Sequence, residues 1–462
     1  MLNAGVARVD ITPKVGVAHA GWGAQTHQIS VGNDMPLHVT ALVVTNDDVE
    51  LAIVDVDIGI FTNQQDKDIR ELISNESGIP FSNIRLAYTH THSGPITFGQ
   101  WIKDGIDLAN EWWNTIPSAC AKAVVEAKAS AQPARTGFGR GSCDVNVNRR
   151  PARDNGELFT GRNWDGAVDH SVDVVSFDDV DDNPIATIVN YAMHPTIMGH
   201  ENQWVTPDFP GPMRSVVEHT VGGLCLFLQG ASGNQGPVDG FTGDIRVYRK
   251  AGSKLGAEAS RVRLNIEPRK REERLDHILA SGTDLGIYSN VPANESDETV
   301  AVSNVTVDVP SKNVISLTDA QTIFDAGEIE LEAVRASGAS EEEVRRAVSK
   351  VMRANIQLSV ARLSYENTKE RHIELTAQSM RIGETVLVSI PVEPFVELAQ
   401  AVKERSSSAN TVFSGFSNGH INYLVTDIAH EEGGYEVSVS VFAPGSAELV
   451  IGASIESIDE VL

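Results

Sequence analysis

Apolar and polar positions alternate along the chain with two periods, and this pattern predicts strands and helices that follow one another. A period of two is typical of a strand, and a spacing of three and four is typical of a helix. Strands are predicted near residues 6–9, 38–45, 51–56, 84–88, 172–177, 185–192, 224–228 and 385–390. Helices are predicted near 65–75, near 106–131 with an interruption at Pro117, near 208–218 with Asp208 as the N-cap, and near 243–262. The alternation predicts an α/β fold, with mixed β-sheets flanked by helices.

A second pattern interrupts this alternation late in the chain. Residues 319–335 and 340–368 predict two long helices, joined at Ala336-Ser337-Gly338. Their charged faces and apolar spacing are typical of an antiparallel helical hairpin. We therefore expect a helical hairpin arm at about 317–368, inserted in a single domain that spans 1–462. A structural arm or a dimer contact is its favoured role, so a homo-oligomer stays open.

Charge narrows the choice of partners. The chain has 37 Lys and Arg against 63 Asp and Glu, a net charge of −26. Nucleic acid demands a basic surface, and an anionic membrane does so too. We expect neither nucleic acid binding nor stable membrane association, since no apolar stretch reaches the roughly 20 residues of a membrane span. The N-terminus lacks a signal-peptide pattern, so we expect a cytoplasmic protein. We expect its partner to be a small-molecule substrate.

Two histidines stand where a short β-prone run ends. His90 and His92 follow the run 84–88 and precede Ser93-Gly94-Pro95, which stops regular structure. Side chains two apart on extended backbone point the same way, so both imidazoles can face one site. Imidazole is a common zinc ligand. His-x-His pairs are also frequent on surfaces, so the pair alone does not establish a zinc site.

Later strand ends carry more candidates. His194 follows the strand at 185–192, and Glu393 follows the strand at 385–390. Sites of α/β proteins lie at the C-terminal ends of strands. Two imidazoles, one carboxylate and a water in the open position form a catalytic zinc arrangement. The spacing leaves open whether these distant residues meet.

Two further charged groups have alternative interpretations. Asp57 ends the strand at 51–56 among apolar residues, and a buried carboxylate needs a partner. We expect it to accept a hydrogen bond from a metal-bound imidazole; a solvated turn is the alternative. Arg149 belongs to an arginine pair, which is usually solvated but has the geometry to clamp a carbonyl or carboxylate.

Seven short motifs occur in order along the chain. They are Thr-His-Thr-His-Ser-Gly-Pro at 89–95, Asn-Val-Asn-Arg-Arg-Pro at 146–151, Asn-Tyr-Ala-Met-His-Pro at 190–195, Gln-Gly-Ala-Ser-Gly-Asn at 229–234, Pro-Val-Glu-Pro at 391–394, Tyr-Leu-Val-Thr at 423–426 and Tyr-Glu at 435–436. In this order they resemble the motifs of neutral/alkaline non-lysosomal ceramidases. The resemblance covers nearly the whole chain.

The resemblance implies a metal site and a reaction. It implies a Zn²⁺ ion held by His90, His194, Glu393 and Tyr423. It implies four groups beside the metal: His92 as a hydrogen-bonding or acid/base group, Arg149 on the substrate or the developing oxyanion, and Tyr435 and Asp57 as supports. The implied reaction is hydrolysis, in which zinc polarises the scissile carbonyl and activates water.

The chain also departs from the family pattern. The serine that the family treats as catalytic is Gly236 here, and His420 stands where the family has a tyrosine. Ceramidases carry an additional C-terminal β domain and are usually secreted or membrane-facing, whereas this chain stops at Leu462 and is strongly acidic. We therefore expect a short, cytosolic member that cleaves a linear amide (C–N) bond in a small soluble substrate. The alternatives are a zinc hydrolase of an ester, a lactone or a ring C–C bond, and a non-catalytic metal-binding protein.

Overall fold

The computed structural model describes residues 2–19, 21–96, 102–269, 271–292, 296–369 and 371–462. Its largest sheet has eight strands in the order β11-β9-β8-β6-β1-β3-β4-β5. They are β1 (Asn3–Asp10), β3 (His38–Thr45), β4 (Glu50–Val56), β5 (Ile84–Tyr88), β6 (Gln132–Ser142), β8 (Ser171–Asp179), β9 (Pro184–Tyr191) and β11 (Leu224–Gln229). Two neighbouring pairs, β4/β5 and β9/β11, are parallel and the others antiparallel, so this sheet is mixed, as predicted.

A second sheet packs face to face on the first. Its path is β15-β17-β18-β20, with β16 beside β17. The strands are β15 (Val300–Pro310), β16 (Thr368–Lys369), β17 (His372–Ile382), β18 (Thr385–Ser389) and β20 (Thr411–Ser414). Leu42 and Ile53 of the first sheet share one buried cluster with Met380 and Leu387 of the second.

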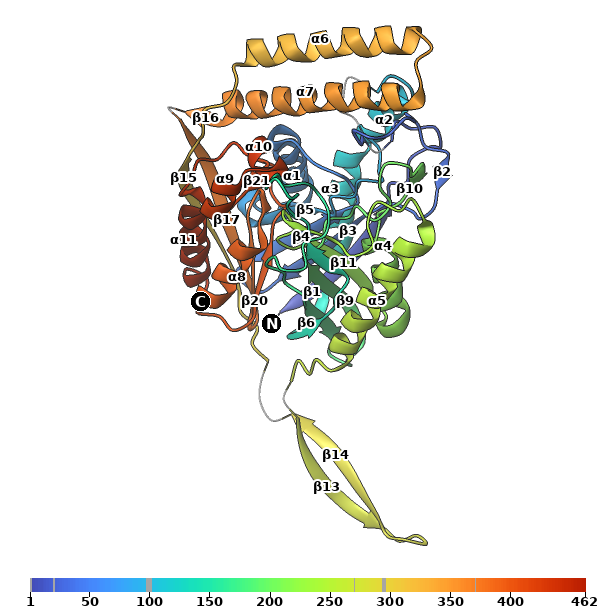
Figure 1. Ribbon diagram of the computed structural model, residues 1–462. Helices are drawn as coiled ribbons and strands as arrows, with labels where there is room; N and C mark the ends of the chain where they lie inside the picture. The colour runs from blue at the N-terminus through green and yellow to red at the C-terminus, as the bar shows by residue number, and fades with distance from the viewer. Residues whose placement is uncertain (1, 20, 97–101, 270, 293–295, 370) are drawn as a thin grey trace.

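Helices cover the outer faces of both sheets (Figure 1). They are α1 (Asn63–Ser77), α2 (Ile106–Trp113), α3 (Ile116–Ala129), α4 (Pro210–Val221) and α5 (Ile245–Leu264) on the first sheet, and α8 (Val396–Arg405) and α11 (Ser446–Asp459) on the second. Alternate residues of strand β4 pack on opposite faces of the sheet. Ala52 and Val54 pack under the helices, and Leu51 and Ile53 pack between the sheets. Both faces are covered, so the strand is apolar throughout.

Short elements shape the loops at the strand ends. They are β2 (Gly32–Asn33) with β10 (Trp204–Val205), β7 (Asn146–Asn148) with β12 (Gln235–Pro237), β19 (Glu393–Pro394) with β21 (Tyr423–Leu424), the 3₁₀ turn η1 (Phe81–Asn83), α9 (Asp427–Glu432) and α10 (Tyr435–Val439). These two-stranded ladders fix loop residues to one another across long sequence separations.

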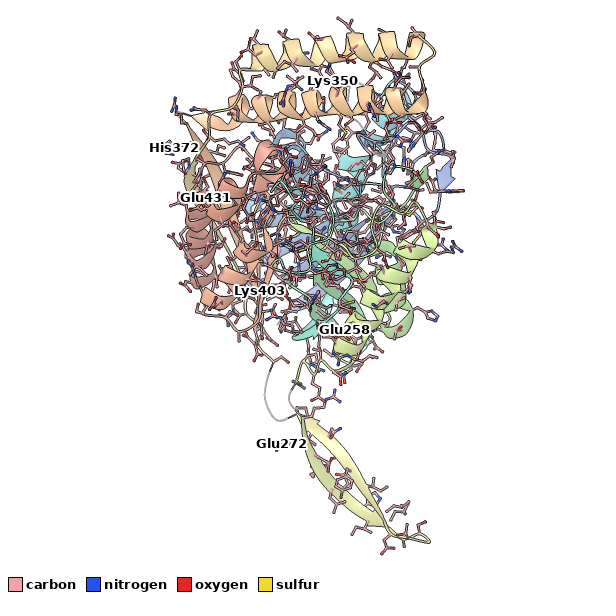
Figure 2. All side chains as sticks on the ribbon, viewed as in Figure 1. Glu258, Glu272, Lys350, His372, Lys403 and Glu431 are labelled. Carbon is pink, nitrogen blue, oxygen red and sulfur yellow. The ribbon has the colours of Figure 1, made fainter. Side chains whose placement is uncertain are left out.

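Two hairpins lie outside the layers. The helical hairpin α6 (Leu317–Ala336) and α7 (Glu341–Asn367) runs along the top of the molecule in Figure 1, close to its predicted bounds. The strands β13 (Arg271–Leu279) and β14 (Leu285–Pro292) pair only with each other and extend away from the layers. Figure 2 shows Glu272 on this extended hairpin.

One predicted interruption is confirmed and one predicted helix start is wrong. The helix expected at 106–131 is divided between α2 and α3, and Pro117 lies in the first turn of α3, where a missing N–H costs nothing. The helix expected from Asp208 begins at Pro210 instead; its N-cap is Phe209, and Asp208 lies at a φ of 59°. The three cysteines are free and buried. Among the described residues, we find no helix that is long and apolar enough to span a membrane.

Candidate metal centre

The ends of both sheets bring the candidate ligands together. His90 follows β5 and His194 follows β9, both in the first sheet. In the second half of the chain, β19 and β21 pair in parallel with Glu393 opposite Tyr423. The centre therefore lies where the strand ends of the two sheets meet.

Three imidazoles and one carboxylate converge there. His90 Nε2 lies 3.1 Å from His194 Nε2 and 3.3 Å from His92 Nε2. Glu393 Oε2 lies 3.6 Å from His90 Nε2 and 4.0 Å from His194 Nε2. The potential ligand atoms of the three histidines all lie within 4.8 Å of one another. This spacing suits ligands that surround one ion.

The outer nitrogens fix the tautomers of two histidines. His90 Nδ1 lies 2.6 Å from the Gly59 carbonyl oxygen, and His194 Nδ1 lies 3.2 Å from the Ser232 carbonyl oxygen. A carbonyl only accepts, so each Nδ1 carries the proton and each Nε2 of the neutral ring presents a lone pair. Two lone pairs that face each other at 3.1 Å repel unless a cation lies between them. A histidine that donates Nδ1–H to a main-chain carbonyl and turns Nε2 toward the site is typical of metal-binding histidines.

The charge states agree with a cation site. Burial lowers the pKa of all three imidazoles, to about 3 for His92, so they are neutral. Burial alone would raise the pKa of Glu393, but His90 and His420 outweigh it and lower this pKa to about 2. Glu393 Oε1 is bonded to His420 Nε2 at 3.0 Å, whereas the buried Oε2 has no hydrogen-bond partner among the described residues. A buried carboxylate oxygen without a partner is costly, and a metal ion between the imidazoles would supply one.

Tyr423 joins the centre to a buried group of charges. Its hydroxyl accepts a hydrogen bond from Arg149 Nη2 at 3.0 Å, and the residue lies opposite Glu393 in the β19/β21 ladder. Arg149 Nε donates to Glu436 at 3.0 Å, and Arg150 Nη1 donates to the other oxygen of Glu436 at 2.7 Å. Arg149 is therefore held against the centre by two partners. Arg149 and Arg150 are buried, so the arginine pair is not solvated.

The backbone at the two histidines differs from the prediction. The strand ends at Tyr88, and His90 has a φ of 63°, so it is not extended. His90 and His92 still meet, with their ring centroids 4.9 Å apart. The turn after Tyr88, rather than the period of two, aims both rings at one point.

Asp57 is not a partner of the imidazoles, and that prediction is wrong. Its Oδ1 accepts from Arg214 Nη2 at 2.5 Å, and its Oδ2 accepts from the main-chain N–H of His38 at 2.9 Å. Arg214 also donates to Asp55 at 2.8 Å. The buried Arg214 of α4 pairs with both carboxylates, while His90 and His194 use main-chain carbonyls instead.

Two other predicted positions and Trp22 lie at the edge of the centre. Tyr435 is 45% exposed, and its ring lies 5.9 Å from the Tyr423 ring, so it faces solvent. A Cβ on Gly236 would lie 3.2 Å from Arg149 Cβ, so the residue at this position borders Arg149. The Trp22 ring lies 5.1 Å from the His92 ring.

Sequence reasoning missed two participants. The sequence presents Glu436 only as part of a motif and His420 only as a departure from the family pattern, yet both are bonded to residues of the centre. The signal for Glu436 was the arginine pair at 149–150, because two buried cations require a carboxylate. Nothing in the local sequence around His420 indicates its contact with Glu393.

Comparison with known proteins agrees with this geometry. A family model described as neutral/alkaline non-lysosomal ceramidase, N-terminal, matches residues 2–241, which is more than half of the chain. The chain therefore belongs to this family, and the resemblance seen in the motifs is confirmed.

Individual relatives match shorter segments. Neutral ceramidase B of Dictyostelium discoideum is 33% identical over 147 residues, which are 31% of this chain and 20% of that protein. Neutral ceramidase of Pseudomonas aeruginosa is 27% identical over 201 residues, which are 40% of this chain and 29% of that protein. The aligned segments thus span less than a third of these relatives.

Solved structures share the fold. A crystal structure of neutral ceramidase from Pseudomonas aeruginosa superimposes with a TM-score of 0.68 at 20% identity, and covers 100% of this chain and 75% of that chain. A structure described as ceramidase complexed with C2 gives a TM-score of 0.66 at 18% identity, with coverage of 99% and 74%. The predicted α/β class with mixed sheets is confirmed.

Proposed function

We propose that this chain is a Zn²⁺-dependent hydrolase that cleaves an amide C–N bond in a small soluble substrate. The observation that carries the proposal is the convergence of two imidazole lone pairs and the unpartnered Glu393 oxygen on one point. The names of the relatives support an amide bond, since ceramidases act on ceramide.

The donor set fits zinc. His90 and His194 would offer nitrogen, and Glu393 and Tyr423 would offer oxygen, which suits a borderline cation such as Zn²⁺. When bound, the ion would supply Lewis-acid activation of the scissile carbonyl and of a water molecule.

Arg149 would bind the substrate carbonyl oxygen. Its Nε and Nη2 are engaged by Glu436 and Tyr423, and Nη1 has no partner among the described residues. A guanidinium held in this way is an electrostatic group that is already oriented before negative charge develops. His92, in contact with Trp22 and next to His90, would hold a proton at Nε2 within reach of the reacting atoms.

The surroundings favour a small polar substrate. Arg149, Arg150 and Glu436 form a buried ionic group at the centre, which suits polar groups better than alkyl chains. Gly236 contributes no side chain of its own beside Arg149.

The first experiment measures metal content. The wild type and Glu393→Gln are purified without chelator, supplied with Zn²⁺, desalted and measured by elemental analysis. We expect about one zinc per wild-type chain and a loss of most of it in the variant, because the variant lacks one anionic ligand. The matched control is Glu431→Gln, an exposed carboxylate on α9 that Figure 2 shows on the surface.

Activity then distinguishes the bond types. Matched linear amides and esters of small acids are assayed with and without chelator. Chelator-sensitive turnover of amides supports the proposal, and turnover of esters or lactones alone favours the ester alternative. A wild type that holds no zinc would overturn the hydrolase proposal. A zinc protein without turnover, in which Arg149→Ala leaves ligand binding unchanged, favours the binding-protein alternative.

A further inference from the structure

A cationic groove lies along the helical hairpin, between α6 and α7 and beside Ala24 of the body, apart from the metal centre. We call it the arm groove, and its volume is about 610 Å³, within the range of small-molecule sites. It is lined by Ala24, Ile323, Gly327, Arg345, Arg346, Ser349, Lys350, Arg353, Ala354 and Gln357. Four of these ten side chains are cationic and none is acidic, in a chain whose net charge is −26.

Helical spacing places the cations on one face of α7. Arg346, Lys350 and Arg353 follow one another at intervals of four and three, so their side chains are neighbours. Figure 2 shows Lys350 between α6 and α7. The positive groups therefore form a continuous strip along the groove.

The ion pairs of this strip are weak and lie outside the groove. Arg345 pairs with Glu341 at 3.1 Å, and Arg346 pairs with Glu342 at 2.5 Å; both carboxylates are about 70% exposed. Lys350 pairs with the half-exposed Glu330 of α6. Exposed pairs of this kind contribute little, so an incoming anion can replace them.

Two cationic side chains of the groove have unused donors. Arg353 has no ion pair within the described ranges. Arg345 Nε is buried and lacks a hydrogen-bond acceptor among the described residues. A buried donor without an acceptor carries a free-energy cost that a bound anion would remove.

Apolar and small residues also line the groove. Ala24, Gly327 and Ala354 are small, and Ile323 is 43% exposed although it is a large apolar residue. Apolar residues beside cationic ones suit a ligand with an apolar body and an anionic head. Guanidinium groups bind phosphate through paired N–H donors.

We propose that the arm groove binds an organic phosphate monoester with a small apolar body. The proposal is independent of the hydrolase activity, since none of the lining residues belongs to the metal centre. The groove also borders the loop of the centre: Ala24 lines it, a Cβ on Gly23 would lie 3.0 Å from Met352 Sδ of α7, and Trp22 contacts His92. A bound phosphate ester would hold this loop against α7.

The test is isothermal titration with 1-naphthyl phosphate, and 1-naphthol and inorganic phosphate are titrated in parallel. Phosphate also binds metal ions, so all titrations use chelator-treated protein. We expect the ester to bind more tightly than either fragment, and Arg346→Gln/Arg353→Gln to weaken it about tenfold or more, since each lost phosphate contact to Arg costs a charge-assisted hydrogen bond.

The matched control removes two charges from the same hairpin outside the groove. It is Arg335→Gln/Arg362→Gln, which we expect to change the affinity by less than about twofold, because neither side chain lines the groove and salt screens exposed charges. If the groove variant unfolds, Arg353→Gln alone replaces it, because this exposed side chain has no ion pair in the described structure. Hydrogen exchange locates the site: slower exchange in residues 342–354 and 21–25 supports the proposal. No binding of the ester, or equal loss in both double variants, overturns it.

Discussion

At the residue scale, the metal centre is built on backbone conformations that L residues rarely adopt. His90, Phe416, Asn418 and Asn422 all have φ angles between 53° and 68°. Each such residue costs roughly 1–2 kcal/mol unless its side chain bonds locally. Asn418 offsets this cost, since its Oδ1 accepts from Leu86 N–H at 2.8 Å. The strain is therefore compensated by bonds between the loop and β5.

A buried carboxyl away from the centre predicts a pH dependence of stability. Burial raises the pKa of Asp208 to about 7, although main-chain N–H groups of Phe209 and Met198 oppose this shift. Between the unfolded value near 3.8 and the folded value near 7, the folded state holds the proton and the unfolded state loses it. The contribution of Asp208 to the free energy of unfolding therefore falls as pH rises from about 4 to 7.

The Asp208→Asn variant isolates this contribution, because its amide does not titrate. We expect the wild type to lose stability relative to the variant between pH 5 and pH 8, by a few kcal/mol. Urea unfolding at several pH values measures it. Asp181→Asn, at an exposed turn, is the control and should leave the pH profile unchanged. Parallel profiles for wild type and Asp208→Asn would contradict the prediction.

At the element scale, the close approach of α3 to β1 depends on one glycine. A Cβ on Gly5 would lie 2.1 Å from the Ala127 carbonyl oxygen and 2.5 Å from the Ala131 nitrogen. Main-chain atoms cannot move aside as a flexible side chain can. We expect Gly5→Ala to lower the free energy of unfolding by at least about 2 kcal/mol, measured by denaturant unfolding.

Gly452 of α11 provides the opposite case. Nothing lies within 4 Å of a Cβ at this position, which is exposed in a helix. We expect Gly452→Ala to stabilise the protein by about 0.5–1 kcal/mol, because alanine loses less backbone entropy. If both glycine variants change stability in the same direction, the clash at Gly5 is not the cause.

Elements were predictable where burial is periodic, and their partners were not. Strands such as β3 and β11 have apolar runs that predict their bounds within one residue. The pairing of β1 with β3 and β6, and the stacking of two sheets, depend on contacts between distant segments. A local pattern carries no information on these contacts.

The same limit applies to the candidate site. Strand ends indicated His90, His194 and Glu393, because sites of α/β folds lie there. The salt bridge of Asp57 with Arg214 and the contact of His420 with Glu393 join segments 157 and 27 residues apart. Tyr423 entered only through the family motifs. Candidate ligands at strand ends could be predicted from the sequence, but their contacts with distant segments could not.

At the scale of the whole molecule, the metal centre joins the two halves of the fold. His90 and His194 follow strands of the first sheet, and Glu393 and Tyr423 follow β18 and β20 of the second. An ion held by all four would bind only the folded arrangement of both sheets. Metal binding and global stability are then thermodynamically linked.

This linkage predicts that chelation destabilises the entire chain. At a free zinc concentration of 100 times the dissociation constant, one site adds about 2.7 kcal/mol to the free energy of unfolding. We expect chelator to lower the thermal midpoint of the wild type, measured by circular dichroism. The midpoint of Glu393→Gln should be lower from the start and insensitive to chelator, since the ion is already lost. If chelator lowers the midpoint equally in both proteins, the stabilising ion lies elsewhere, and the centre does not join the sheets through a metal.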